Sequence, residues 1–420
     1  MKLNFFCIVY FLVVTPFCFS QSQKELYTLS IEAYKNKNYA EFLKITKKLD
    51  SIRPSHPAYT YNLAVAYNLN NQKEMAISVL KNAILMNNKV AFEEDLDFSN
   101  LHQTEGYKEL IDLKINQEKP VIGSTKVVSL SEKSLHPESV LFLPKLGIWL
   151  ASSIRKRKIV TFNMTTGKCG DYAVKNNLLS VFAMKTDDAE KYLWIATAAM
   201  PEMEGFSKDL KGKSEIVKGS IQTGEIVNRF PLEGNHIFGD LVIAKSGIVY
   251  VSDSGEAVIY KISNDKIEPW LDLRKEAYNL QGLTFNADHS KLFIADYFKG
   301  ILVISMKNPN DRKWLTFPKG TTVKGIDGLV YYKKSLIAVH NGVTPIRLIQ
   351  YNLDDNENQI TTYKILDNNR PEFDEPALAT IVKDKLYFFA NSPWKGYDKD
   401  FNLDENKFEN PMLYSYPLKK

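Results

Sequence analysis

The sequence has few of the residues that build zinc clusters, disulfide frameworks or nucleotide sites. It contains 3 cysteines and 6 histidines in 420 residues, and neither type occurs at metal-ligand spacing. It has no glycine-rich phosphate loop and no serine-nucleophile elbow, so nucleotide hydrolysis and serine-hydrolase chemistry are poorly supported. Neither sign of charge dominates, because 54 Lys and Arg stand against 49 Asp and Glu, a formal net charge of +5. A dedicated nucleic-acid-binding protein is therefore not expected.

The one long apolar run lies at the N-terminus. Phe5–Val14 is uninterrupted and follows the positive charge of Lys2, a pattern typical of a secretory signal peptide that is too short to span a bilayer. We therefore expect residues 1–20 to be removed, leaving an exported protein, periplasmic or secreted, with no membrane span. A lipoprotein signal centred on Cys18 is disfavoured by the bulky residue before it. Signal removal leaves Cys169 as the only thiol, which we expect at a half-buried strand end.

Residues 21–117 carry apolar side chains at helical spacing. Tyr34 and Tyr67 each follow an alanine, and their separation of 33 residues is close to the period of tetratricopeptide repeats. We expect tetratricopeptide-like helical repeats here, with a degenerate third unit, and a linker over residues 118–125. Two roles remain open for the repeats: a packing module, or a groove that docks a protein partner.

From residue 126 onward the apolar period changes to two, and one pattern of turn, apolar strand and second apolar strand recurs. Its copies begin at Pro137, Leu178, Phe238, Leu280, Ile326 and Asp374. The spacing from Glu138 to Glu375 averages roughly 47 residues, as in four-stranded propeller blades. We expect a multidomain protein in which helical repeats precede an all-β six-bladed β-propeller over residues 126–420. A strand at Lys126–Leu130 would complete the last blade and close the ring.

The first strand of every blade lines the central channel of a propeller, with its first residue at the channel mouth. The six copies place there Glu138, Leu179, Gly239 with its neighbour Asp240, Gln281, Asp327 and Glu375. Carboxylates gathered at one point repel one another unless they are protonated or bridged by a cation. Their oxygen atoms suit Ca²⁺, or another hard divalent cation, better than Zn²⁺. The simpler alternative is that each acid caps a turn where a strand begins.

Two histidines are further candidates for the channel mouth. His236 precedes the turn of the third copy, and His340 ends the second strand of the fifth. We expect them to contact substrate there together with Asp240, unless they are hydrogen-bonded structural residues. Asp253 and Asp296 end second strands at equivalent positions, where aspartate usually satisfies the backbone amides of a turn.

Three other motifs have structural interpretations. Asn341-Gly342 is a hairpin-turn signal. The basic run Arg155–Lys158 is expected at a solvated hairpin tip. The insertion Met200–Glu215 lengthens the second blade, either as a lid over one face or as a surface loop.

The whole propeller resembles the gluconolactonase, or senescence-marker-protein, family, which is related to the paraoxonase and strictosidine-synthase propellers. The stretches that carry this resemblance are Phe238–Leu241, Val249–Ser254, Gln281–Phe285, Leu292–Asp296 and Gly325–Leu329. An exported bacterial branch with helical repeats before the propeller also shares Phe373–Pro376 and Ala390–Trp394.

The resemblance implies a metal site and lactone chemistry. In that family a glutamate of the first blade, an asparagine of the fourth and an aspartate of the fifth bind the metal, and the aspartate is the proposed general base. Glu138 and Asp327 match this pattern, whereas Gln281 replaces the asparagine. Gly239 replaces a further asparagine, and Glu375 adds a carboxylate. The expected metal ligands are Glu138, Gln281, Asp327 and Glu375.

Two functions follow as expectations. The first is an exported, calcium-dependent, lactonase-like hydrolase of a small lactone or ester, with Asp327 as general base. The second is a non-catalytic propeller that binds a ligand or a protein, with the helical repeats as the docking module.

Overall fold

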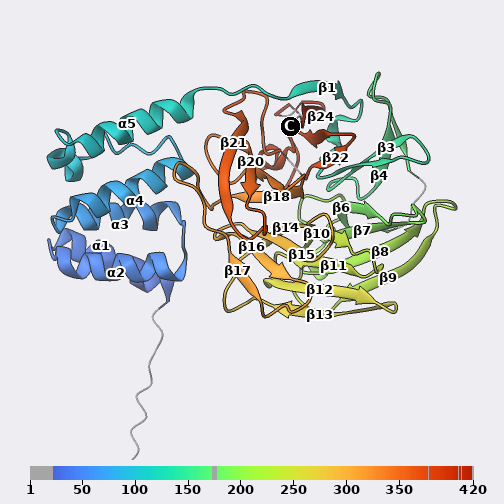
Figure 1. The fold of residues 1–420 in the computed structure, drawn as a ribbon, viewed down its shortest axis with the longest axis horizontal. Helices are drawn as coiled ribbons and strands as arrows, with labels where there is room; N and C mark the ends of the chain where they lie inside the picture. Colours follow the sequence, from blue (N-terminus) through green and yellow to red (C-terminus); the bar gives the residue numbers. More distant parts are fainter. Residues whose placement is uncertain (1–21, 173–176, 377, 405, 408, 419–420) are drawn as a thin grey trace, which may run out of the picture.

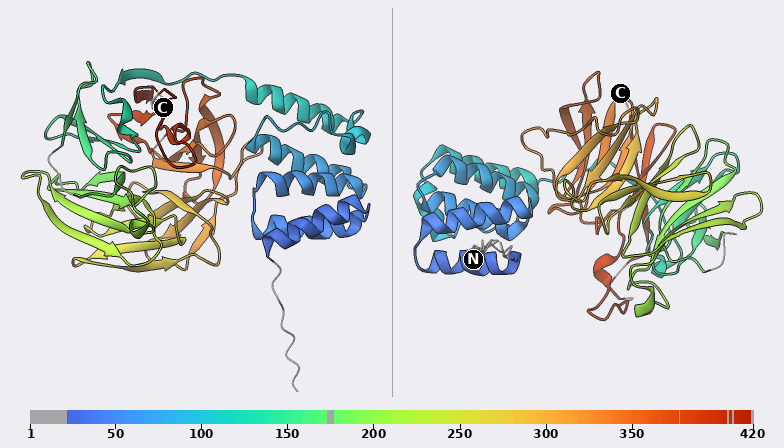
Figure 2. Two further views of the ribbon diagram at one scale, coloured as in Figure 1. Left: turned by 180° about the vertical axis from the view of Figure 1, so that it is seen from behind. Right: turned by 90° about the horizontal axis from the view of Figure 1, so that it is seen from below.

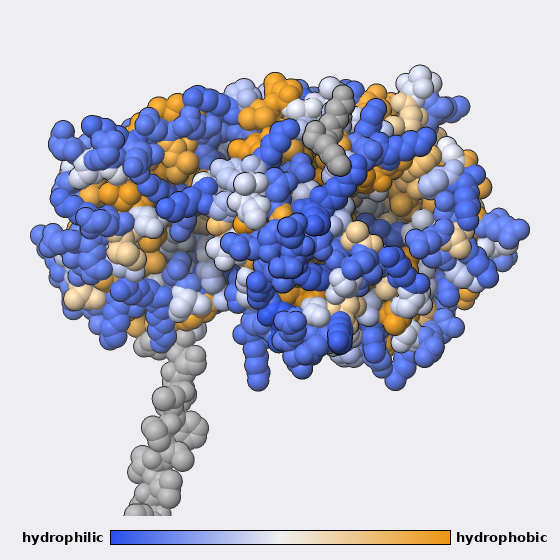
Figure 3. Space-filling view, in the orientation of Figure 1, coloured by the Kyte–Doolittle hydropathy of each residue, from blue (hydrophilic) through white to orange (hydrophobic). Residues whose placement is uncertain are grey.

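A computed structural model describes residues 22–172, 177–376, 378–404, 406–407 and 409–418. The predicted signal peptide, residues 1–20, lies outside this range. The described chain forms a stack of helices beside a ring of β-sheets (Figure 1). The face seen in Figure 3 is largely hydrophilic, with apolar residues in small separate patches. None of the described helices is long and apolar enough to cross a membrane.

The helical part confirms the predicted repeats. Its elements are α1 (Gln23–Lys35), α2 (Tyr39–Ile52), α3 (Pro57–Leu69), α4 (Lys73–Met86), the 3-10 helix η1 (Leu96–Leu101) and α5 (Glu105–Glu118). Pro57 occupies the first position of α3, where its missing N–H leaves no helical hydrogen bond unmade. Ala64 and Ala66 of α3 and Ala76 of α4 are fully buried in the core of the helical stack. These small side chains let the two helices pack closely, as the alanine pattern predicts.

The remaining chain forms six four-stranded sheets within the described residues, which confirms the six-bladed propeller. Blade 1 contains β2 (Val140–Leu143), β3 (Ile148–Ser152), β4 (Ile159–Phe162) and β5 (Cys169–Asp171). Blade 2 contains β6 (Ser180–Thr186), β7 (Tyr192–Ala198), β8 (Ser214–Ser220) and β9 (Ile226–Leu232). Blade 3 contains β10 (Phe238–Ile243), β11 (Val249–Asp253), β12 (Val258–Ser263) and β13 (Lys266–Asp272).

The ring continues through the yellow, orange and red segments of Figure 1. Blade 4 contains β14 (Leu280–Phe285), β15 (Lys291–Asp296), β16 (Gly300–Ser305) and β17 (Arg312–Trp314). Blade 5 contains β18 (Ile326–Tyr331), β19 (Ser335–His340), β20 (Arg347–Leu353) and β21 (Ile360–Asn368). Blade 6 contains β22 (Thr380–Val382), β23 (Lys385–Phe389), β24 (Met412–Pro417) and the early strand β1 (Thr125–Ser129).

The ring closes through β1, as the sequence predicts. β1 pairs antiparallel with β24, with Val128 opposite Leu413 and Ser129 opposite Met412, and the two strands lie together at the top of Figure 1. The first strand of the domain thereby covers an edge of the last blade, which would otherwise expose unpaired backbone groups.

The helical stack is joined to blade 5 by backbone pairing. Thr344, in the loop between β19 and β20, donates its N–H to the carbonyl of Met86 (2.9 Å) and accepts from the N–H of Asn88 (2.8 Å). The buried Arg347 side chain donates to the carbonyl of Leu85 at the end of α4. Both views of Figure 2 show the helices beside the ring rather than over its central channel.

Two local predictions have different outcomes. Cys169 begins β5 and is half-buried, as expected. The basic run Arg155–Lys158 is not a solvated tip, because its side chains are only partly exposed. Arg155 and Lys156 form ion pairs with Glu204 of the blade 2 insertion, so the run anchors that insertion.

Candidate functional site

One pocket of about 260 Å³ gathers side chains from separate blades at the channel mouth. The predicted residues among its lining are Glu138, Asp240, Gln281, Asp327 and Glu375. Blade geometry thus brings together residues spread over 237 positions of the chain, as the repeat alignment predicts.

Irregular pairing where the inner strands begin helps to aim these side chains. The register between β18 and β19 shifts between Ile326 and Gly328, so Asp327 stands in a bulge. The ladders of blades 3 and 4 shift at the equivalent places, between Phe238 and Asp240 and between Leu280 and Leu283. A bulge locally re-aims a side chain out of the ladder.

Glu138 is the most enclosed of the three acids that face one another. It is 6% exposed, and its Oε2 accepts hydrogen bonds from Ser392 Oγ and Trp394 Nε1, both at 3.2 Å. Burial raises its pKa well above the usual value, and the charges of Asp327 and Glu375 raise it further against the effect of these two donors. Oε1 has no hydrogen-bond partner among the described residues.

Asp327 is held by one neighbour. Asn341 Nδ2 donates to Asp327 Oδ2 at 2.6 Å. Burial raises the pKa of Asp327 to about 6, with a further contribution from Asp240, while the hydrogen bond from Asn341 opposes the rise. A carboxyl with a pKa near neutrality is suited to accept a proton.

Glu375 has an unusual backbone for a non-glycine residue. Its φ of 63° lies in the left-handed region, which costs conformational energy and is concentrated at functional sites. Burial raises the pKa of Glu375 to about 7, assisted by the charge of Asp327. No ion pair within 4.0 Å compensates Glu138, Asp327 or Glu375 in the described part of the chain.

The side chains of Asp240 and Gln281 already form hydrogen bonds with neighbouring groups. The Asp240 carboxylate accepts the N–H groups of Leu241 (2.8 Å) and Leu283 (3.2 Å), and Lys185 Nζ lies 4.0 Å from it. Asp240 therefore does not cap a turn but joins the inner strands of blades 3 and 4, since Leu241 lies in β10 and Leu283 in β14. Gln281 Nε2 donates to Asn279 Oδ1 at 2.5 Å, which leaves its amide oxygen for another partner.

The two predicted histidines are not brought to the pocket. His236 contacts Asp253 Oδ2 (2.6 Å) through Nδ1 and the carbonyl of Glu233 (3.0 Å) through Nε2. His340 contacts the carbonyl of Lys324 and the Tyr351 hydroxyl, each at 3.0 Å. Both rings are buried with both nitrogens engaged. The substrate-binding roles expected for them therefore have no support, and the structural alternative accounts for their contacts.

The predicted turn role of Asp253 and Asp296 is confirmed. Asp253 accepts the N–H groups of Ile237 and Gly255. Asp296 accepts four backbone N–H groups, those of Tyr278, Asn279, Phe298 and Lys299.

Sequence reasoning missed three polar pocket residues that occupy one repeated position. Ser254, Tyr297 and Asn341 each directly follow the second strand of blades 3, 4 and 5, and all three line the pocket. The reading of Asn341 as a hairpin-turn signal alone was wrong, because this side chain holds Asp327. Aligning the residue after each second strand would have found the set.

An apolar wall completes the pocket. Its members are Phe182, Met200, Ile237, Leu378 and Trp394. Met200 opens the blade 2 insertion, in which Met203 is 3% exposed and packs with Leu179 and Ala199. The insertion is thus packed against blade 2 and contributes to the pocket through Met200, as the lid alternative requires.

The carboxylate oxygens of the pocket are suitable ligands for a hard cation, but they are not close enough together to form a coordination shell. Glu138, Asp327 and Glu375 offer carboxylate oxygens without a compensating positive charge. Within the described ranges, however, no three Asp, Glu, His or Cys side chains are close enough to coordinate an ion as they stand.

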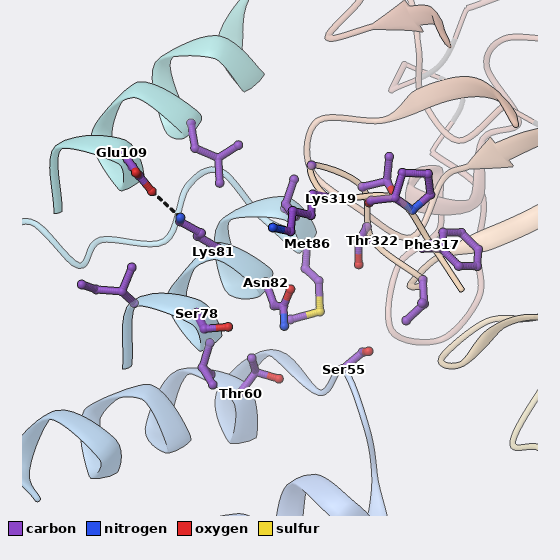
Figure 4. Close-up of a pocket in the computed structure, with 18 of the residues that line it drawn as sticks. Ser55, Thr60, Ser78, Lys81, Asn82, Met86, Glu109, Phe317, Lys319 and Thr322 are labelled. Carbon is purple, nitrogen blue, oxygen red and sulfur yellow. Dashed lines mark hydrogen bonds and ion pairs between the residues drawn. The ribbon is translucent and has the colours of Figure 1, made fainter. Parts of the chain in front are cut away.

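A second cavity, of about 990 Å³, lies between the helices and the propeller. Figure 4 shows α4 and α5 on one side, where Lys81 pairs with Glu109, and the loop from Phe317 to Thr322 on the other. Asn82 and Ser78 also line this cleft. Docking of a protein partner by the repeats stays a prediction.

Comparisons with known proteins give structural likenesses alone. No family model matches the chain, and no curated protein matches it in sequence. Regucalcin, a calcium-binding protein from Agrobacterium tumefaciens, is 14% identical with a TM-score of 0.48, covering 70% of this chain and 93% of its own. Virginiamycin B lyase from Staphylococcus aureus is 12% identical with a TM-score of 0.46, covering 71% and 99%.

A third likeness is to a putative oxidoreductase (glucose dehydrogenase) from Thermus thermophilus. It is 14% identical with a TM-score of 0.44, covering 71% of this chain and 98% of its own. Likenesses this distant carry no argument about activity, and the six-bladed assignment rests on the strand order itself. Membership of the gluconolactonase-like family stays a prediction.

Proposed function

We propose that this protein is an exported, divalent-cation-dependent hydrolase of small lactones or esters, with Ca²⁺ as the expected ion. The observation that carries the proposal is the convergence of Glu138, Asp327 and Glu375 on one pocket without ion-pair partners among the described residues. Buried like charges are stable only when they are protonated or neutralised by a cation. The pocket volume of about 260 Å³ limits the substrate to a small molecule.

Asp327 has the chemistry of the general base. A bound divalent cation would polarise the substrate carbonyl and acidify an attacking water. Asn341 fixes Asp327 Oδ2, which leaves Oδ1 to accept the proton of that water. Glu138 is fixed through Oε2 by Ser392 and Trp394, so Oε1 remains as an oxygen ligand.

The apolar wall positions the rest of the substrate. Phe182, Met200 and Trp394 face the same pocket as the carboxylates. A compact ring such as a lactone can contact this wall while its carbonyl lies toward the acids. Exclusion of water by these side chains also strengthens the electrostatic interactions within the pocket.

The test is the nearly isosteric Asp327→Asn variant, assayed with a panel of γ- and δ-lactones and 4-nitrophenyl acetate in the presence of Ca²⁺. Loss of the general base should lower kcat/KM by roughly a factor of 100 or more. Asp374→Asn is the matched control, because Asp374 carries the same charge near the site but pairs with Lys395 at the surface. Turnover by Asp327→Asn equal to that of the control would reject the role of Asp327.

A non-catalytic binding propeller is the second candidate, and a specific observation favours it. Asp240 is occupied by backbone amides, and Gly239 supplies no side chain to the pocket. A binding protein needs no complete catalytic shell. It would gain thermal stability from Ca²⁺ but would hydrolyse no member of the lactone and ester panel.

A further inference from the structure

A buried cation lies at the joint between the helices and blade 5. Lys324 is 8% exposed, and its Nζ lies 4.8 Å from the centre of the Phe298 ring and 5.7 Å from that of Tyr297. No carboxylate of the described residues pairs with it. Burying an ammonium group without a counter-charge is costly, and burial accordingly lowers the pKa of Lys324 to about 8, with a contribution from Arg53.

Two more basic groups approach from the helical side. The Arg53 guanidinium follows α2 and lies 5.4 Å from the centre of the same Phe298 ring. His56 precedes α3, and its Nδ1 is buried without a hydrogen-bond partner in the described structure. Burial lowers the pKa of His56, and the charges of Arg53 and Lys324 lower it further. Three basic side chains therefore meet here, and none of them forms an ion pair with a described acid.

The N-terminus of α3 also favours an anion at this place. Its preceding residue, His56, makes no side-chain capping bond, and Pro57 stands at the first helical position. The free amides of a 13-residue helix and its dipole favour an anion at this end. Pro57 and Lys324 border a cleft of about 420 Å³. Arg370 and Lys395 line it too, but each is already paired with an acid.

We propose that the joint formed by Arg53, His56, Pro57 and Lys324 binds the phosphate or carboxylate group of a small anion. The anion would neutralise the buried ammonium of Lys324 and bridge the helical stack to the propeller. This site is separate from the carboxylate pocket, since Pro57 and Lys324 line the cleft whereas the three carboxylates line the pocket. The two are neighbours, because Asn341 lines both the cleft and the pocket.

The experiment measures binding of inorganic phosphate to the full chain by isothermal titration calorimetry at low ionic strength, with chloride at equal ionic strength as reference. Glycerol 3-phosphate and acetate form parallel arms. Tighter binding of glycerol 3-phosphate than of phosphate indicates a ligand with an organic group in the cleft, whereas tightest binding of acetate indicates a carboxylate ligand.

The decisive variant is Lys324→Met, which removes the charge and keeps an apolar side chain of similar length. Phosphate affinity should fall at least tenfold, because a charge-assisted contact is lost. Without phosphate, the variant should melt at or above the temperature of the natural protein, since an unpaired buried charge is gone. Lys319→Met is the matched control from the same loop, where Lys319 is exposed, and its phosphate affinity should not change.

Arg53→Gln gives a second readout should Lys324→Met fail to fold. Arg53 is exposed, and this variant should weaken phosphate binding while leaving lactone turnover unchanged. Absence of phosphate binding beyond the chloride reference, or equal losses in the Lys324 and Lys319 variants, would overturn the proposal. Neither result depends on whether the channel pocket is catalytic.

Discussion

Removal of divalent cations should make the stability of this protein fall as the pH rises from 5 to 8. The groups responsible are Asp327 and Glu375, whose pKa values burial raises to about 6 and about 7. A carboxyl with a raised pKa keeps its proton in the folded state after the unfolded chain has released it. Its contribution to the free energy of unfolding is therefore complete below its ordinary pKa. That contribution is lost as the pH rises through the pKa of the folded state.

The magnitude follows from the two shifts. Asp327 moves from 3.8 to about 6 and Glu375 from 4.5 to about 7. At about 1.4 kcal/mol for each factor of ten in proton affinity, either shift alone corresponds to about 3 kcal/mol. Above pH 5, Asp327 loses its contribution over about one pH unit and Glu375 over about two, which correspond to about 1.4 and about 2.7 kcal/mol. The two carboxyls repel each other, so the combined loss between pH 5 and pH 8 is less than the sum of these two values. Ca²⁺ at a hundredfold excess over its Kd should restore about 2.7 kcal/mol at pH 8.

The assay is urea unfolding at pH 5, 6, 7 and 8, with EDTA or with Ca²⁺. In EDTA, Asp327→Asn should be more stable than the natural protein at pH 8 and should show a flatter pH profile, because it removes one repelling charge. Asp374→Asn should change the profile far less, because the charge of Asp374 makes the smallest contribution to the raised pKa of Glu375. A metal-free stability that does not change with pH, or a loss of stability at pH 8 in Asp327→Asn, would refute the picture of uncompensated carboxylates.

Three further predictions concern Ca²⁺ binding, backbone conformation and export. Trp394→Phe keeps an aromatic wall but removes a hydrogen bond to Glu138, so it should weaken Ca²⁺ binding several-fold in calorimetry and leave the fold intact. Gly325→Ala should lower the melting temperature more than Gly147→Ala. Both glycines have positive φ, but only at Gly325 would a Cβ meet backbone atoms, 2.6 Å from Gly342; equal losses would contradict this. Fractionation of cells should find the natural chain exported and a chain without residues 1–20 retained inside; equal distributions would contradict a signal peptide.

The fold was predictable because it repeats. Six similar stretches, each with strands at the same offsets, define blades whose first strands must surround one axis, and this places Glu138, Asp327 and Glu375 together without knowledge of any contact. The histidines were mispredicted because sequence position shows that a residue is near the channel but not which way its ring turns. Bonds to Asp253 and Tyr351 turn both rings into the blades.

The joint between the helices and the propeller had no such signal. Arg53 lies in the part of the chain with helical spacing of apolar residues, and Lys324 lies in the part with strand spacing. Neither pattern specifies that the two side chains approach one aromatic ring. Their meeting depends on how α4 docks on blade 5, through backbone bonds that Thr344 makes to Met86 and Asn88. Backbone pairing of this kind depends on shape rather than on side-chain identity, so it leaves no trace in composition or spacing.

The same docking supports the carboxylate pocket. Thr344 lies three residues beyond Asn341, whose side chain holds Asp327. The loop between β19 and β20 is therefore fixed at one end by the helical stack and at the other by its contact with the candidate base. The helical stack is thus connected to the pocket through the backbone of one loop, although it does not cover the channel.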